Sequence, residues 1–101
     1  MKRPVENKRA LAQQKELFKV VTKLKTADEC QRFFVDLCTP AELQAMADRW
    51  QVARLLHKSL PYREIHDQTS VSTATITRVA RCLMYGESGY KSALQRVKET
   101  R

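Results

Sequence analysis

Only two glycines (Gly86 and Gly89) and three prolines (Pro4, Pro40 and Pro61) interrupt the 101 residues of the chain. A β-sandwich or β-barrel needs a turn signal about every 8–12 residues, so this scarcity counts against those folds and favours helices. No run of about 18 apolar residues occurs, which excludes a membrane span, and the N-terminus lacks the apolar stretch of a secretory signal. We expect an all-α, cytoplasmic protein.

The net charge of +8 is concentrated at the two ends of the chain. Residues 1–25 carry +6 and residues 78–101 carry +4, whereas residues 26–77 carry −2. Such asymmetry is typical of an arm or face that meets a polyanion, although a solvated helix face gives the same pattern. We assign residues 1–25 to a basic N-terminal helix or arm and residues 26–101 to a helical domain. The arm either packs in a dimer or follows DNA, and we expect no binding to membranes.

The side chains that carry most enzyme chemistry form no recognisable set. Cys30, Cys38 and Cys82 are odd in number and lack C-x-x-C or ordered Cys/His spacing, so we predict neither a disulfide framework nor a metal site. No Ser/His/Asp or Cys/His constellation and no glycine-rich phosphate loop appears either. We therefore expect a protein that is not an enzyme.

Apolar residues recur at spacings of three and four along most of the chain, which predicts about six helices. The first starts near Pro4, and the second is capped by Thr26. The third runs from residue 40 to residue 60, and Thr39 and Glu42 form a capping box at its start. Its expected core stripe is Leu43, Met46, Ala47, Trp50, Ala53, Leu56 and Leu60.

Two shorter helices are expected at about 62–68 and 72–85, the second ended by a left-handed Gly86, and a last helix at about 90–98. The apolar stripes together exceed what one small core can bury. The second helix alone contributes Cys30, Phe33, Phe34, Leu37 and Cys38. A second subunit would cover the excess, so we expect a homodimer.

The most informative segment is YREIHDQTSVSTATITRVAR, residues 62–81. It reads as a short helix, a tight turn and a second helix opened by Ser72, with Ile76, Val79, Ala80 and Leu83 on the inner face. The outer face has small and hydroxyl side chains near the helix start and arginines further along, which suits a helix whose N-terminal end enters the DNA major groove. The residues expected to contact bases or phosphates are Arg63, His66, Ser72, Thr73, Ala74, Thr75, Thr77, Arg78 and Arg81.

The same segment resembles a helix-turn-helix by its Val-Ser and Ile-Thr-Arg pairs at 71–72 and 76–78. Two positions depart from that pattern. His66 replaces the usual small residue of the first helix, which implies an altered crossing of the two helices. Ser70 replaces the usual turn glycine, at a cost of about 1 kcal/mol in a left-handed conformation.

A longer resemblance covers most of the chain. The sequence is similar to the Trp repressor family, and in particular to its YerC/YecD branch. The matching residues are Thr39-Pro40, Arg49, Leu55-Leu56, Arg63-Glu64, Ala74-Thr75-Ile76-Thr77-Arg78, the run from Val79 to Leu83, Tyr85-Gly86 and Gly89-Tyr90. The resemblance implies an all-α, intertwined homodimer with two heads that read double-stranded DNA.

The family's corepressor site carries over only in part. By resemblance, Arg49 and Arg78 would enclose a small-molecule effector, with Thr39 at the start of the long helix as a further contact. Val79 stands where the family has a glycine that leaves room for an indole ring, and Cys82 stands where a serine contacts the ligand amine. Both departures argue against tryptophan as the ligand, and leave DNA binding without tryptophan or a response to another effector.

We therefore predict a sequence-specific, DNA-binding transcriptional regulator, most simply a repressor. The alternative is a helical protein-interaction module that no longer reads DNA, which the slightly acidic middle segment keeps open.

Overall fold

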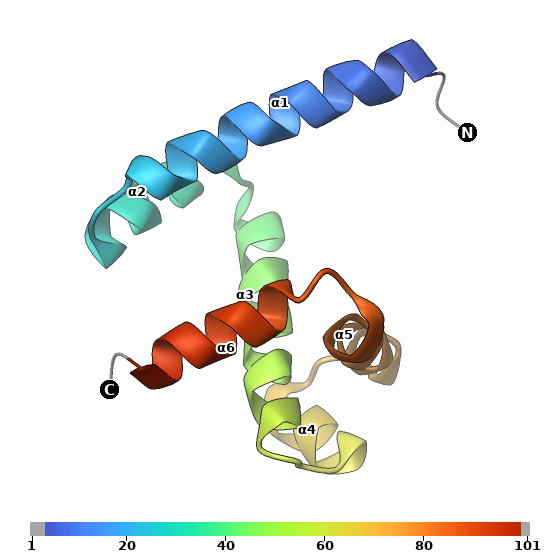
Figure 1. The fold of residues 1–101 in the computed structure, drawn as a ribbon. Coiled ribbons are helices and arrows are strands. Elements are labelled where there is room, and N and C mark those ends of the chain that lie inside the picture. Colours follow the sequence, from blue (N-terminus) through green and yellow to red (C-terminus); the bar gives the residue numbers. More distant parts are fainter. Residues whose placement is uncertain (1–3, 100–101) are drawn as a thin grey trace. The chain divides into compact units, whose positions relative to one another are not determined.

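A computed structural model of the protein describes residues 4–99, and all regular structure in that range is helical (Figure 1). This confirms the all-α prediction. The helices are α1 (Pro4–Lys23), α2 (Ala27–Leu37), α3 (Pro40–His57), α4 (Tyr62–Thr69), α5 (Thr73–Tyr85) and α6 (Gly89–Glu99). None of the described helices is both long enough and apolar enough to cross a membrane. The contacts divide the chain into two units between Thr39 and Pro40, so that α1 and α2 form the first and α3 to α6 the second.

The first unit shows the predicted helix start at Thr26. The Thr26 hydroxyl accepts a hydrogen bond from the backbone N–H of Glu29 at 3.1 Å, and the Glu29 carboxylate in turn accepts one from the backbone N–H of Lys25 at 3.0 Å. The first bond satisfies a backbone donor that an α-helix leaves free at its start, and the second ties the residue before the cap to the same turn. Thr26 is therefore confirmed as the N-cap of α2.

Apolar side chains of the first unit remain accessible. Between residues 7 and 39 no side chain is buried, and Leu11, Phe18 and Leu37 are about half exposed, at 56%, 59% and 49%. The rings of Phe33 and Phe34 contact each other edge to face, with centroids 5.5 Å apart. The burial that we expected for the stripe of α2 is thus not achieved within a single chain.

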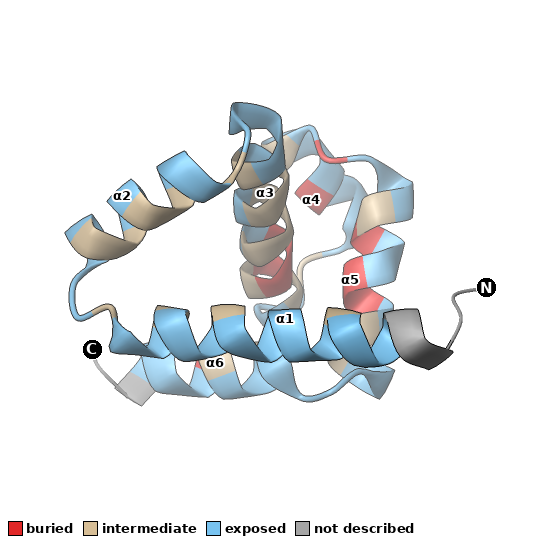
Figure 2. Cartoon of the chain, turned by 90° about the horizontal axis from the view of Figure 1, so that it is seen from above, coloured by how far each residue is buried: buried red, intermediate tan, exposed pale blue. Residues whose placement is uncertain are grey.

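The second unit contains the core. Helix α3 packs against α4 and α5, α4 packs against α5, and α5 also contacts α6. Figure 2 shows the buried positions gathered on α3, α4 and α5. The core cluster consists of Val52, Ala53, Leu55, Ile65, Val71, Ile76 and Val79. The predicted inner face of α5 is confirmed, since Ile76, Val79 and Ala80 are buried and Leu83 is partly buried.

The predicted core stripe of α3 is confirmed in its C-terminal part, where Ala53 is buried and Trp50, Leu56 and Leu60 pack against the core cluster. The other two buried residues of α3, Val52 and Leu55, were not in the stripe. Helix α3 contacts both α4 and α5, so the surface it buries is wider than one helical stripe and includes positions that periodicity assigns to the flank. Leu43 and Met46 are only partly buried and Ala47 is exposed.

Helix α3 ends at His57, earlier than the predicted Leu60. The backbone N–H of Leu60 donates to the Leu55 carbonyl at 3.2 Å, and that of Ser59 donates to the Leu56 carbonyl at 2.9 Å. With Ser59 in the left-handed conformation (φ 65°), this is the Schellman arrangement that closes a helix. Leu60 then packs against the core. The start at Pro40 agrees with the prediction, and the capping box of Thr39 and Glu42 stays a prediction.

Helix α5 ends at Tyr85 as predicted, but Gly86 is not left-handed. Its φ is −82°, and its N–H donates to the Cys82 carbonyl at 2.9 Å. A Cβ at this position would overlap the Cys82 carbonyl oxygen and lie 3.1 Å from the carbonyl carbon. Close approach of the backbone, rather than a positive φ, therefore requires glycine here.

Gly86→Ala should lower the free energy of unfolding by about 1–3 kcal/mol, because the added methyl group meets backbone that cannot move without loosening the end of α5. Gly89→Ala is the matched control. Nothing lies within 4 Å of a Cβ there, and alanine in a helix is favoured over glycine by about 0.5–1 kcal/mol. Urea denaturation followed by circular dichroism compares the two, and equal stability of both variants would contradict the steric argument.

Candidate nucleic-acid interface

Helices α4 and α5 are joined by the three residues Ser70–Ser72 and form the predicted helix-turn-helix. Ile65 of α4, Val71 of the turn and Ile76 of α5 all belong to the core cluster. These three side chains hold the two helices against each other and against α3. The exposed face of α5 is therefore held in position by the packing of α5 on α3 and α4, not by a mobile loop.

Ser70 has the left-handed conformation that the helix-turn-helix pattern predicted, with φ 62° and ψ 10°. Its backbone N–H donates to the His66 carbonyl at 2.8 Å, which closes the end of α4. Serine therefore occupies the usual glycine position without disrupting the turn.

Two side chains that support the turn were not foreseen. His66 Nδ1 lies 2.7 Å from the Val71 carbonyl oxygen. Because a carbonyl can only accept, Nδ1 carries the hydrogen and Nε2 is left for another partner. Thr69 Oγ1 donates to the Ile65 carbonyl at 2.7 Å and accepts from the Val71 N–H at 3.1 Å. No sequence signal reveals these bonds, since they depend on the path of the turn.

Hydrogen bonds in the first turns of α5 fix the orientation of its hydroxyl groups. Ser72 is the N-cap, and its Oγ accepts from the Thr75 N–H at 3.2 Å while donating to Thr75 Oγ1 at 3.1 Å. Thr77 Oγ1 donates to the Thr73 carbonyl at 2.9 Å. The Thr77 oxygen can therefore only accept from an outside partner, whereas Thr75 keeps its hydroxyl hydrogen to donate.

The outer face of α5 is exposed and carries no acidic residue. Its members are Thr73, Ala74, Thr77, Arg78 and Arg81, all exposed as predicted. Arg63 and His66 are exposed on α4. Short side chains at the N-terminal end allow close approach, and the backbone N–H groups of the first turn favour an anion. The two guanidinium groups follow one and two turns further along the helix.

The residues considered for an effector are only partly brought together. Arg78 and Cys82 line a shallow hollow of about 450 Å³ with Ala74, Thr77 and Arg81. Val79 does not face this hollow, because its side chain lies in the core with 1% exposure. Arg49 is partly buried on α3, and Thr39 precedes that helix in the first unit.

The three cysteines and the candidate metal ligands form no site among the described residues. Cys30, Cys38 and Cys82 are free thiols, each partly buried. Within the described part of the chain, no group of three or more His, Cys, Asp or Glu side chains is placed to hold a metal ion.

An all-helical fold with an exposed helix-turn-helix, whose second helix carries arginines and no acidic residue, is typical of DNA-binding regulators. A sequence profile of the Trp repressor protein family matches residues 12–98. The chain belongs to the Trp repressor family, as the sequence predicted, and this family is regulatory rather than enzymatic.

Individual relatives agree with this assignment. The uncharacterized protein YerC of Bacillus subtilis (strain 168) is 52% identical over 85 residues, which cover 84% of this chain and 82% of that protein. A Trp operon repressor homolog of Actinobacillus succinogenes is 48% identical over 54 residues, 52% of this chain and 54% of that protein.

Solved structures show the same fold. A TrpR-like protein of Eubacterium eligens superposes with a TM-score of 0.79 at 39% identity and covers 83% of this chain and 87% of that one. A protein of Staphylococcus aureus, assigned provisionally to the Trp repressors, superposes with a TM-score of 0.83 at 37% identity over 96% of each chain.

Proposed function

We propose that this protein is a cytoplasmic transcriptional repressor that binds a specific DNA operator as a homodimer. The observation that carries the proposal is the outer face of α5, where small and hydroxyl side chains precede Arg78 and Arg81 on a helix held in place by the core. Such a face fits the major groove, and the α4–α5 pair is the arrangement in which a second helix reads bases.

Residues of the outer face, and Thr75 beside it, differ in the contacts they can make with bases. Thr77, whose hydrogen is engaged by the Thr73 carbonyl, would accept from the amino group of cytosine or adenine. Thr75 would donate to a guanine or thymine oxygen, and the Ala74 methyl group would contact a thymine methyl. Arg78 and Arg81 would contact guanines or the nearest phosphates.

Phosphate contacts would fix the position of the helix on the duplex. Arg63 is exposed on α4, and His66 keeps Nε2 available because Nδ1 is bonded to the Val71 carbonyl. The backbone N–H groups in the first turn of α5, which Ser72 caps, could bind phosphate as well. Together with Arg63 and His66 they would hold the DNA phosphates on either side of the groove.

The dimer is supported by the absence of any buried side chain between residues 7 and 39, since a second copy would cover the apolar surface of α1 and α2. A two-fold dimer places its two reading helices about one DNA turn apart, near 34 Å, and so requires a near-palindromic operator. The net charge of +6 in residues 1–25 would add attraction to DNA without sequence preference.

Repression is supported by the name of the Actinobacillus relative, a Trp operon repressor homolog. We propose that this chain binds its operator without tryptophan. Cys82, in the hollow beside Arg78, offers only a weak hydrogen-bond partner for an ammonium group.

The test uses DNA selected from a random-sequence pool with the purified protein. Fluorescence anisotropy should show two chains per selected duplex, and affinity should fall about a thousandfold or more between about 50 and 200 mM salt, as several phosphate contacts require. Added L-tryptophan should leave the affinity unchanged. Failure to enrich any sequence, with binding insensitive to salt, would instead favour a protein-interaction module.

A further inference from the structure

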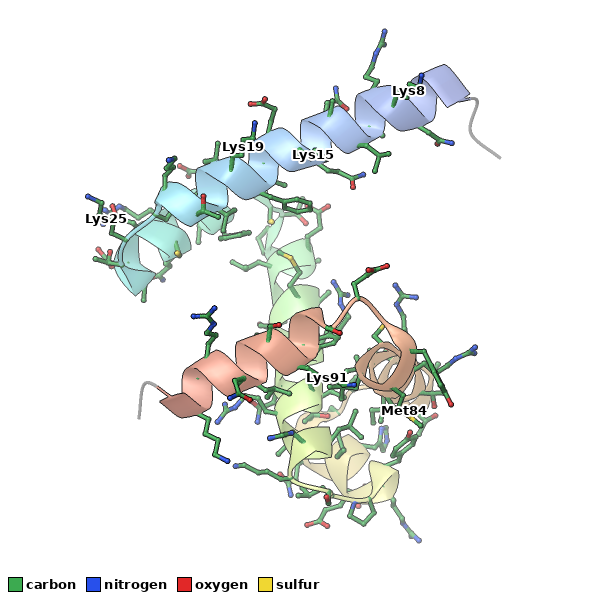
Figure 3. The ribbon with its side chains drawn as sticks, viewed as in Figure 1. Lys8, Lys15, Lys19, Lys25, Met84 and Lys91 are labelled. Atoms are coloured by element: carbon green, nitrogen blue, oxygen red, sulfur yellow. The ribbon has the colours of Figure 1, made fainter. Side chains whose placement is uncertain are left out.

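A second concave surface borders the C-terminal half of α5, where it is lined by Ala80, Leu83 and Met84. It is a cleft of about 700 Å³ bordered by the end of α3, the start of α4, and helices α5 and α6. Figure 3 shows Met84 and Lys91 on two of these helices, α5 and α6. Its volume is within the range of sites that bind small molecules, about 300–1,000 Å³.

The floor of the cleft is apolar. Leu56, Leu83 and Leu94 come from three different helices and line it together. Two large side chains at its edge remain accessible, Met84 at 64% and Tyr62 at 43% exposure. An apolar group bound here would bury the accessible hydrocarbon surface of these side chains as well as its own.

The rim of the cleft is basic. Lys91 and Lys98 stand seven residues apart on α6 and therefore on the same face, and His57 lies at the end of α3. A smaller adjoining hollow of about 110 Å³ shares His57 and Lys98 and adds Arg54 and Lys58. Among the side chains that the structure describes, no acidic one lines either space. The rim thus favours a negatively charged occupant.

We propose that this cleft binds an amphipathic monoanion, with its apolar body on the leucine floor and a carboxylate or sulfonate at Lys91 and Lys98. Charge argues against a second copy of the chain as the occupant, because residues 1–25 are themselves strongly basic, at +6. On α6 the polar side chains of Lys91, Gln95 and Lys98 surround Leu94 at the cleft, which is unlike the apolar centre of a subunit interface.

The cleft is separate from the hollow that contains Arg78 and Cys82. It contacts α5 through Ala80, Leu83 and Met84, whereas Ala74 and Thr77 line only the other hollow. An anion bound here would join α6 to the helix that carries the outer face. Binding itself does not depend on the proposed DNA function and is measured without DNA.

Calorimetric titration of the full chain with 4-phenylbutyrate tests the proposal, with neutral 4-phenylbutanamide as the matched probe. We expect saturable binding of one phenylbutyrate per chain, and binding of the amide weaker by about tenfold or more, as loss of a charged hydrogen bond predicts. The double variant Lys91→Glu/Lys98→Glu should lose phenylbutyrate binding. Lys15→Glu/Lys19→Glu, the same charge change on exposed positions of α1, should keep it.

Amide chemical shifts measured during the titration locate the bound anion. The signals of Ala80, Leu83 and Leu94 should move and reach a plateau together. Equal binding of acid and amide would overturn the proposal, and so would movement confined to Arg78 and Cys82. Absence of saturable binding, as expected if a second copy fills the cleft, would overturn it as well.

Discussion

Thr75→Asp should weaken binding to the selected operator by at least about a hundredfold while leaving the fold intact. Thr75 is the third helical residue of α5 after the N-cap Ser72, at the end of the helix that we place in the major groove. A carboxylate there would face the phosphates and carbonyl oxygens of the groove, and like-charge contact at an interface costs several kcal/mol.

The same substitution is benign for the helix. A carboxylate at the third position accepts hydrogen bonds from free N–H groups and suits the helix dipole, which stabilises by about 0.3–1 kcal/mol. Loss of DNA binding in this variant is therefore separable from unfolding.

Thr75→Asn is the matched control, because it has the shape of aspartate without the charge, and should stay within about tenfold of wild-type affinity. Gel shift and anisotropy measure both variants, and circular dichroism verifies the helices. Wild-type affinity in Thr75→Asp would remove Thr75 from the interface and overturn the placement of α5.

Ile65→Ala should lower the free energy of unfolding by about 2–5 kcal/mol, the range for truncating a fully buried isoleucine. Ile65 has no exposed surface and lies in the cluster shared by α3, α4 and α5. A small domain has only about 5–15 kcal/mol of net stability, so a large part of it would be lost.

Urea unfolding followed by Trp50 fluorescence measures this loss, because Trp50 packs against the same core. Tyr85→Ala is the control. That side chain is large and apolar but 79% exposed, so its removal should change stability by no more than about 0.5 kcal/mol. Similar effects of the two substitutions would mean that the core is not where the structure places it.

The helix-turn-helix could be predicted because its signals are local. Ser72 caps α5 through a bond to a residue three positions away, and the inner and outer faces of α5 follow from a spacing of three and four. Thr26 was predictable for the same reason. In each case the residues that decide the structure lie within one helical turn of each other.

Features set by distant contacts could not be predicted. The buried side of α3 depends on two neighbours, α4 and α5, which no periodicity within α3 specifies. The bond between His66 and the Val71 carbonyl exists only once the turn has formed. Gly86 was expected for its backbone freedom, but what requires it is the nearby Cys82 carbonyl.

All buried side chains between residues 7 and 98 come from the second unit. We therefore expect α3 to α6 to unfold together as one cooperative unit. Helices α1 and α2 gain little stability from burial within their own chain. The unit that we propose to read DNA thus has its own core, independent of what covers α1 and α2. Two chains could therefore associate or separate without any change in the outer face of α5. Protein concentration would then control how many copies of that face bind one DNA molecule.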